Sequence, residues 1–144
     1  MAALFNLKII ACDGVFFDGQ CQQLIFEGED GKVGIMGHHE PMTGAIEIGN
    51  LRIQLEDGSW QLAVVSDGYI TVYPGGDAKI LVYSCEKPED IDAFRAQEAL
   101  ERAQEQLQEK QSLQEYHISR ANMARAMARL AAVGAGTHVA DYNK

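Results

Sequence analysis

The chain has 144 residues, which is enough for one hydrophobic core with a small appendage but not for two full-sized domains. Its composition, with 47% apolar and 23% charged residues, is that of a globular protein and not of a disordered one. The formal net charge of -9 disfavours nucleic acid as a partner, because proteins that bind the phosphate backbone present a basic face.

No membrane span or disulfide framework is predicted. Lys8 interrupts the apolar stretch near the N-terminus, and no later segment approaches the ~20 apolar residues that a membrane-spanning helix needs. We therefore expect membrane association only through partners. The three cysteines, Cys12, Cys21 and Cys85, form no CxxC pair and are odd in number. We therefore expect each of them to be a small side chain in the core or in a strand, and we expect the protein to reside in a reducing cytoplasm.

The first part of the chain, residues 1–86, is punctuated by glycines next to Asp, Asn or Pro, which are turn signals. Between these turns lie strand-sized segments rich in β-branched and aromatic residues, at 24–26, 51–55, 60–65, 69–73 and 79–83. Short strands at this spacing, with no helical segment between them, predict an antiparallel β-sandwich or barrel.

The composition changes to that of helix after Glu86, where glycine is absent until Gly134 and Ala, Glu, Gln, Arg and Leu dominate. Pro88 suits the first turn of a helix. A plausible turn at Gln111 and Ser112 then predicts an antiparallel two-helix hairpin over 87–133. We expect the remaining residues, 134–144, to form a flexible tail.

Each predicted helix has one apolar face, and the two faces form a narrow, alanine-rich seam. Such a seam buries few large side chains, so we expect a marginally stable hairpin that opens or repacks easily. Arginines lie roughly opposite the seam on both helices. The predicted seam consists of Ala96, Leu100, Ala103 and Leu107 on the first helix and of Tyr116, Met123, Met127 and Leu130 on the second.

Motifs of catalysis are absent from the sequence. There is no phosphate-binding GxxxxGK[ST] loop and no GxSxG elbow, so we expect no catalytic residue and no enzyme activity. The pair His38-His39 with Glu40 suggests a metal, but neighbouring strand residues point to opposite faces and further ligands are not evident. We predict no metal site, and a small metal enzyme remains an alternative that bound metal would reveal.

The arginines of the hairpin are the strongest candidates for ligand binding, because guanidinium groups bind phosphates well. The competing interpretation is a solvated face of salt bridges, since Glu98, Glu101 and Glu105 are close enough in sequence to pair with them. Spacing alone favours the solvated face. The arginines concerned are Arg95, Arg102, Arg125 and Arg129.

Two segments resemble a known family. GKVGIMGHHEPMTGAIEIGNLRI resembles the turn and strand signature of the epsilon subunits of bacterial F-type ATP synthases, and IDAFRA matches their nucleotide-associated pattern [IL]DxxRA. The similarity extends to Leu130. It implies a sandwich of about ten strands, followed by a mobile helical hairpin that inhibits ATP hydrolysis when it extends into the catalytic head.

The resemblance also implies a regulatory ATP site, which reverses the preference for a solvated face. In ATP-binding relatives the folded hairpin is held by ATP, with Mg²⁺ as a candidate companion. The residue types of that site are retained here at Glu86, Asp92, Arg95, Arg102, Arg125 and Arg129. A free-standing ATP-binding sensor is the alternative function.

The partners implied by the resemblance are the gamma subunit and the ring of c subunits, with the alpha/beta head as a third when the hairpin extends. The expected contact surface includes Lys32, His39 and Met42, although the family often has an acidic residue where Lys32 stands. The expected role is to couple ion flow to ATP synthesis at the cytoplasmic face of the bacterial plasma membrane, as a peripheral subunit.

Overall fold

The computed structural model describes residues 3–109 and 112–142, with side chains up to residue 134. The chain divides into two compact units, Met1–Glu86 and Lys87–Lys144. Within the described residues, neither α-helix combines the length and the apolar character that crossing a membrane requires.

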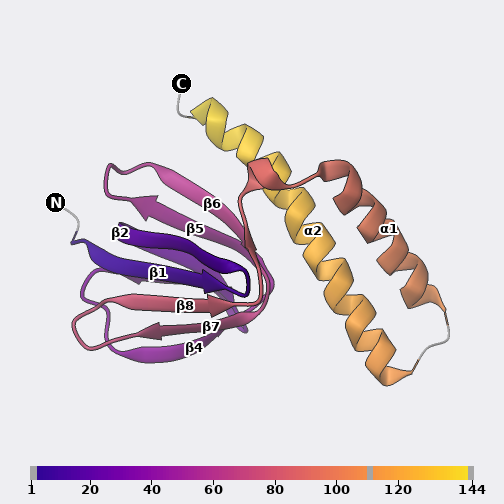
Figure 1. Ribbon diagram of the computed structural model, residues 1–144, viewed down its shortest axis with the longest axis horizontal. Helices are drawn as coiled ribbons and strands as arrows, with labels where there is room; N and C mark the ends of the chain where they lie inside the picture. Colours follow the sequence, from indigo (N-terminus) through magenta and orange to yellow (C-terminus); the bar gives the residue numbers. More distant parts are fainter. Residues whose placement is uncertain (1–2, 110–111, 143–144) are drawn as a thin grey trace. The chain divides into compact units, whose positions relative to one another are not determined.

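The first unit is an open β-sandwich (Figure 1), which confirms the predicted fold class. Its strand order is β4-β7-β8-β1-β2-β5-β6-β9, and β3 pairs with β2 outside this path. β1 runs parallel to β8, while the other strand pairs of the described residues are antiparallel. The strands are β1 (Phe5–Ala11), β2 (Gly14–Gly28), β3 (Gly31–Met36), β4 (Met42–Ile46), β5 (Gly49–Leu55), β6 (Trp60–Val65), β7 (Gly68–Val72), β8 (Ala78–Val82) and β9 (Cys85–Glu86).

The described part of the chain contains nine strands, whereas about ten were predicted. The difference lies in β2, which is 15 residues long and has different neighbours along its two halves. Its first half pairs with β1, and its second half pairs with β3 and β5. The register with β5 shifts between Cys21 and Gln23, so β2 bends without ending. One continuous strand thus takes part in both layers.

Alternating residues of the strands fill the core between the layers. Along β1, for example, Phe5, Leu7 and Ile9 are buried while the residues between them are not. Gly68 is required where β7 approaches β8, because a Cβ at this position would collide with the backbone carbonyl of Leu81. The pattern of short apolar strands separated by glycine turns thus corresponds to strands that bury alternate residues in one core.

The second unit is a helical hairpin. A 3₁₀ turn (η1, Pro88–Asp90) precedes α1 (Ala93–Gln108), so the helix begins later than Pro88 suggested. Asp92 is the N-cap of α1 and accepts hydrogen bonds from the backbone N–H groups of Phe94 (3.0 Å) and Arg95 (3.2 Å). The extended backbone at Ile91, between η1 and this cap, explains the later start.

The second helix, α2 (Leu113–Tyr142), begins at a reciprocal capping box. The backbone N–H of Glu115 donates to Ser112 Oγ, and the backbone N–H of Ser112 donates to Glu115 Oε2, both at 3.2 Å. Ser112 lies where the turn was expected, whereas Gln111 lies outside the described residues.

The far end of α2 differs from the prediction, which ended the helix at residue 133. The backbone remains helical to Tyr142. Alanines on both sides of Gly134 and Gly136 have high helix propensity and compensate the roughly 1 kcal/mol that each glycine costs in a helix. The flexibility expected for 134–144 stays a prediction, and residues 143–144 lie outside the described part.

The seam of the hairpin is alanine-rich, as predicted, but its position on α2 is only partly the one expected. On α1, Ala96 and Ala103 are buried. On α2 the buried residues that match them in spacing are Ser119 and Ala126. Of the four residues predicted for this face, Met123 and Leu130 are half-buried, whereas Tyr116 and Met127 are exposed. Alanine recurs on every side of α2, so the large apolar residues did not define its contact face.

Candidate functional site

A row of apolar side chains crosses the outer face of the sandwich on five strands. Because directly opposed residues in neighbouring strands point to the same face, the strand register defines this row. The register pairs Ala45 with Tyr69, Tyr69 with Leu81, Leu81 with Ile10, and Ile10 with Val15. We call these five residues the apolar row.

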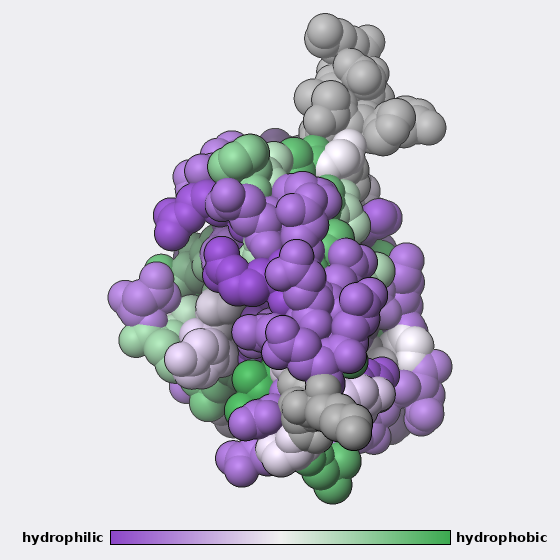
Figure 2. All heavy atoms as spheres, turned by 90° about the vertical axis from the view of Figure 1, so that its right-hand side faces the viewer, coloured by the Kyte–Doolittle hydropathy of each residue, from purple (hydrophilic) through white to green (hydrophobic). Residues whose placement is uncertain are grey.

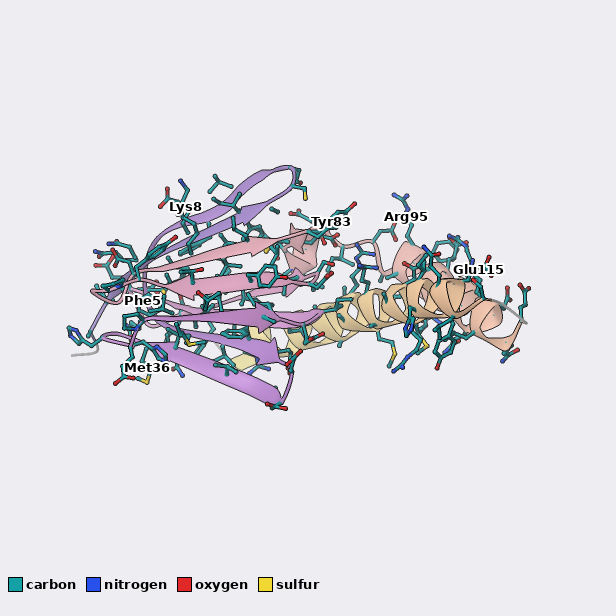
Figure 3. The ribbon with its side chains drawn as sticks, turned by 90° about the horizontal axis from the view of Figure 1, so that it is seen from below. Phe5, Lys8, Met36, Tyr83, Arg95 and Glu115 are labelled. Atoms are coloured by element: carbon teal, nitrogen blue, oxygen red, sulfur yellow. The ribbon has the colours of Figure 1, made fainter. Side chains whose placement is uncertain are left out.

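Much of the apolar row is exposed. The exposed fractions are 65% for Tyr69, 50% for Leu81 and 56% for Val15. Four of its members, all except Val15, line a shallow groove of about 640 Å³. Tyr83, near the end of the sandwich in Figure 3, adds a second exposed tyrosine to the groove.

Polar groups border the apolar row on both sides. Glu47 and Asp67 line the groove at one side. On the other side, the next residues of the same face are Thr43, Thr71, Lys79 and Lys8, which follow the same register. Lys8 points away from the sandwich in Figure 3. A narrow apolar stripe with polar edges is suited to binding another protein surface.

Sequence reasoning missed the apolar row, although a signal for it exists. Ile80, Leu81 and Val82 of β8 are apolar in succession, and so are Ile9 and Ile10 of β1. A strand with one solvated face alternates between apolar and polar residues, whereas a strand covered on both faces does not. The uninterrupted apolar runs therefore indicate that β1 and β8 are covered on both faces, by the sandwich core on one face and by a partner surface on the other.

The three predicted interface residues do not lie together. Lys32 is exposed near the start of β3, opposite Glu27 of β2. His39 follows the end of β3 in the loop before β4, where its Nδ1 lies 2.7 Å from the carbonyl oxygen of Glu40. Met42 opens β4 and is half-buried against the sandwich core. Most of β3, at ~3.3 Å per residue, separates Lys32 from that loop.

The loop after β3 has an unusual backbone conformation at His38, whose φ of 61° lies in the left-handed region. His38 and His39 gave the sequence its one suggestion of a metal. Within the described residues, no group of three or more His, Cys, Asp or Glu side chains is arranged to hold a metal ion.

The four candidate arginines share one side of the hairpin. Arg95, Arg102 and Arg125 each precede a buried seam alanine by one residue, and Arg129 follows Arg125 by one turn. In antiparallel helices, equal rotations from the seam lead to the same side. The arginines therefore flank the seam instead of lying opposite to it. Arg125 and Arg129 are half-buried, while Arg95 is exposed and points outward from α1 in Figure 3.

The two acidic candidates lie in different settings. Asp92 caps α1, so its carboxylate already accepts two backbone hydrogen bonds. Glu86 is half-buried in β9, where it lies opposite Val64 of β6. It belongs to the sandwich unit, whereas the other five candidates belong to the helical unit. The view onto the hairpin in Figure 2 is largely hydrophilic, in keeping with this charged composition.

Family models match nearly the whole chain. A model for the β-sandwich domain of the ATP synthase delta/epsilon chain matches residues 4–88, and a model for the long α-helix domain of the same chain matches residues 89–134. The ATP synthase epsilon chain of Ruminiclostridium cellulolyticum is 42% identical over 130 residues, which cover 90% of this chain and 96% of the relative. That of Caldanaerobacter subterraneus is 38% identical over 131 residues, which cover 90% and 94%.

Solved structures share the fold. A chain of the Euglena gracilis mitochondrial ATP synthase superposes with a TM-score of 0.81 at 20% identity, covering 92% of this chain and 83% of that one. A chain in the central stalk and c-ring structure of the Tetrahymena thermophila mitochondrial ATP synthase gives a TM-score of 0.67 at 11% identity, covering 92% and 98%.

Proposed function

The chain belongs to the ATP synthase delta/epsilon chain family, and we propose that it docks in the central stalk of a bacterial ATP synthase through its apolar row. As an epsilon subunit it is a structural and regulatory component and not a catalyst. The observation that carries the docking proposal is the exposure of Tyr69 and Leu81 on one face of the sandwich.

Exposed apolar surface of this kind supports a permanent partner, because it costs solubility when it is left uncovered. The gamma subunit is the proposed partner of the apolar row, and the ring of c subunits is the proposed partner of the turn region with Lys32, His39 and Met42. The alpha/beta head becomes a third partner when the hairpin extends. The Tetrahymena structure that shares the fold contains a central stalk and a c-ring.

In this position the subunit would help couple ion flow through the membrane sector to ATP synthesis. It would lie peripherally, at the cytoplasmic face of the bacterial plasma membrane. A free-standing ATP sensor would gain nothing from the apolar row. Co-purification distinguishes the two functions, because a stalk subunit retains gamma and a free sensor does not.

We further propose that ATP is a regulatory ligand of the hairpin, with Mg²⁺ as a candidate companion. Four guanidinium groups on one side of two antiparallel helices can bind a triphosphate across both helices. Bound ATP would favour the compact hairpin and relieve the inhibition of hydrolysis. The small side chains of the seam support such a switch, because a seam that buries little apolar area separates two states by only a few kcal/mol.

ATP titration of the intact chain tests the regulatory site. The variants Arg95→Ala and Arg125→Ala should weaken ATP binding. Arg120→Ala is the matched control, because Arg120 follows the buried Ser119 and so lies on the other side of the seam, over the Tyr116 ring at 5.8 Å. Absence of saturable binding, or equal binding by all four proteins, would refute the site.

Hydrolysis by the reconstituted catalytic head tests the regulation itself. The head is assayed with the full chain and with a chain ending at Glu86, across a range of ATP concentrations. We expect inhibition by the full chain that fades as ATP rises, and no inhibition by the shorter chain. Equal rates with both chains at low ATP would contradict the inhibitory role.

A further inference from the structure

Basic side chains are scarce in the sandwich unit. Residues 1–86 contain twelve Asp and Glu but only four Lys and Arg, which are Lys8, Lys32, Arg52 and Lys79. The register places two of these four, Lys8 of β1 and Lys79 of β8, directly opposite each other. Because neighbouring strands lie ~4.8 Å apart, two cationic side chains start side by side in a unit that is otherwise acidic. We call these two residues the lysine pair.

The stability of the sheet does not explain the lysine pair. Like charges at directly opposed positions destabilise a sheet. Lysine often protects the edge strand of a sheet from aggregation, but β8 and β1 are interior strands that have β7 and β2 as their further neighbours. The lysine pair therefore suits a role outside the folding of the sandwich.

Lys8 has one acidic neighbour in its row. On the outer face the register continues from Thr71 to Lys79, Lys8 and Asp18. Asp18 is thus next to Lys8 on β2, whereas Lys79 lies between Lys8 and a threonine. One carboxylate in this row stands beside two cations.

Lys79 also lacks an anionic partner along its own strand. Asp77 lies on the same face two residues before Lys79, but its Oδ1 accepts hydrogen bonds from the backbone N–H (3.1 Å) and the side-chain amide (3.3 Å) of Asn6. Lys79 Nζ lies 6.0 Å from the centroid of the Tyr73 ring, which attracts a cation without neutralising it. The lysine pair therefore has room for a further carboxylate.

The lysine pair borders the apolar row. Lys8 and Lys79 each precede a member of the row by two residues, so they lie on the same face, roughly 7 Å from it. Both are half-buried, so their aliphatic stems cover part of the sheet, and Lys8 points away from the sandwich in Figure 3. Glu47 and Asp67 line the groove at the opposite edge. The two edges of the apolar row thus carry charges of opposite sign.

An apolar stripe alone can be covered by a partner in either of two opposite directions. Edges of opposite charge favour one direction, because the reverse one would bring like charges together. We infer that an acidic side chain of the gamma subunit binds between Lys8 and Lys79 and thereby sets the direction in which gamma lies across the apolar row. The inference rests on the proposed docking of gamma and deepens it.

Charge reversal tests the inference. Lys79→Glu should raise the Kd for the gamma subunit about tenfold at low salt, because a like charge would then meet the acidic side chain of gamma. Lys79→Arg keeps the charge and should bind as the unaltered chain does. Arg52→Glu is the matched control, because it makes the same charge change at an exposed position of β5, which is not a strand of the apolar row. Equal weakening by Arg52→Glu would show that only the net charge matters.

Salt separates the charge from the apolar contact. At ~1 M salt the Debye length falls to about 3 Å, so the difference between Lys79→Glu and the unaltered chain should shrink to about twofold or less. Tyr69→Thr should weaken gamma binding at every salt concentration, because salt does not screen an apolar contact. A loss in Lys79→Glu that is independent of salt would contradict an ion pair.

Cross-linking in the assembled ATP synthase gives a direct readout. A water-soluble carbodiimide joins an amine to a carboxylate only where the two groups touch. We expect a link from Lys8 or Lys79 to an Asp or Glu of gamma, identified by mass spectrometry of the linked peptides. Absence of a link to gamma from both lysines, or a link to a c subunit in its place, would overturn the inference.

Thermal unfolding of the free chain excludes a purely structural role. Since opposed lysines repel each other, Lys79→Gln should leave the melting temperature unchanged or raise it, while it weakens gamma binding about threefold. If Lys79→Glu does not fold, Lys79→Gln replaces it in the binding assay. A clear fall in the melting temperature of Lys79→Gln would assign Lys79 to the stability of the sandwich.

The outcomes separate the two proposals. Unchanged gamma binding in both Tyr69→Thr and Lys79→Glu overturns the docking surface and this inference together. Binding that Tyr69→Thr weakens but Lys79→Glu leaves unchanged at low salt overturns the role of the lysine pair alone.

Discussion

Tyr69 of β7 lies directly opposite Leu81 of β8, and both side chains are at least half exposed on the outer face of the sandwich. Neighbouring residues on the two strands, Ile70 and Ile80, are opposed in the same way on the inner face and are fully buried. This part of the sheet is thus equally apolar on both sides, although only its inner side is filled by its own core.

Replacing Tyr69 by Thr should weaken binding to the gamma subunit. A large aromatic anchor at the centre of an interface contributes about 2 kcal/mol or more, which corresponds to roughly a thirtyfold rise in Kd. Threonine preserves strand propensity, so the sandwich should remain folded. Tyr73→Thr is the control, because Tyr73 is exposed outside the apolar row. Equal retention of gamma by both variants would exclude the row as the docking surface.

Capping and ligand binding by Asp92 can be separated with two substitutions. Asp92→Ala should destabilise the start of α1 by about 1 kcal/mol, because Phe94 and Arg95 lose their hydrogen-bond acceptor, whereas Asp92→Asn should preserve the cap. Amide hydrogen exchange at these two residues measures the effect. A drop in ATP affinity in Asp92→Asn, with unchanged exchange, would assign the charge to the ligand. Faster exchange in Asp92→Asn than in Asp92→Ala would contradict the cap.

The seam of the hairpin should not accept larger side chains. Ala126 is 1% exposed, so Ala126→Leu should force α1 and α2 apart and destabilise the hairpin by about 1–3 kcal/mol. Ala131→Leu is the matched control for Ala126→Leu, because Ala131 is an exposed alanine of the same helix. Hydrogen exchange along α1 should quicken only in the first variant. Protection that is unchanged in both would show that the seam lies elsewhere.

His38→Gly should stabilise the sandwich. The left-handed backbone at φ 61° costs a residue with a Cβ roughly 1–2 kcal/mol, and the flexibility of glycine in the unfolded chain offsets part of the gain. We expect a net increase of about 0.5 kcal/mol in the free energy of unfolding, measured by denaturant titration. His39→Gly, which only removes contacts, should do the opposite. Destabilisation by His38→Gly would mean that its imidazole has an unrecognised structural contact.

Thiol modification at pH 8 should be confined to Cys12, which is exposed. Burial raises the pKa of Cys21 to about 12, and burial together with the nearby carboxylates of Glu86 and Asp13 raises the pKa of Cys85 to about 12. A raised pKa lowers the thiolate fraction at pH 8, and the thiolate is the reactive form. In the unaltered chain, Cys12 should react with a disulfide reagent in a fast phase. Cys12→Ser should abolish this phase, and denaturation should expose the thiols of Cys21 and Cys85. A fast phase that survives in Cys12→Ser would contradict this assignment.

Much of the architecture follows from local patterns. The glycine turns and short apolar segments predicted the sandwich, and the loss of glycine after Glu86 predicted the hairpin, because both signals depend on neighbouring residues. The buried pair Ala96 and Ala103 followed from helical periodicity in the same way. The length of β2 did not follow, since a bend within one strand depends on partners far away in the sequence.

The candidate sites also combine features that the sequence predicts with features that depend on residues far apart in the chain. The arginine positions are visible in the sequence, but their shared side became clear only once Ala126 was known to be buried. The apolar row was missed because Tyr69, Leu81 and Ile10 come from three strands that only the sheet register brings together.

The length of β2 has a mechanical consequence. Its 15 residues pair with β1 along one half and with β3 and β5 along the other. Two layers held together by apolar contacts alone could slide past each other under a sideways load. Here the covalent backbone of one strand runs from layer to layer, so such a load is carried along peptide bonds and ladder hydrogen bonds. The two layers of the sandwich therefore cannot easily slide past each other, which suits a subunit that docks in a central stalk.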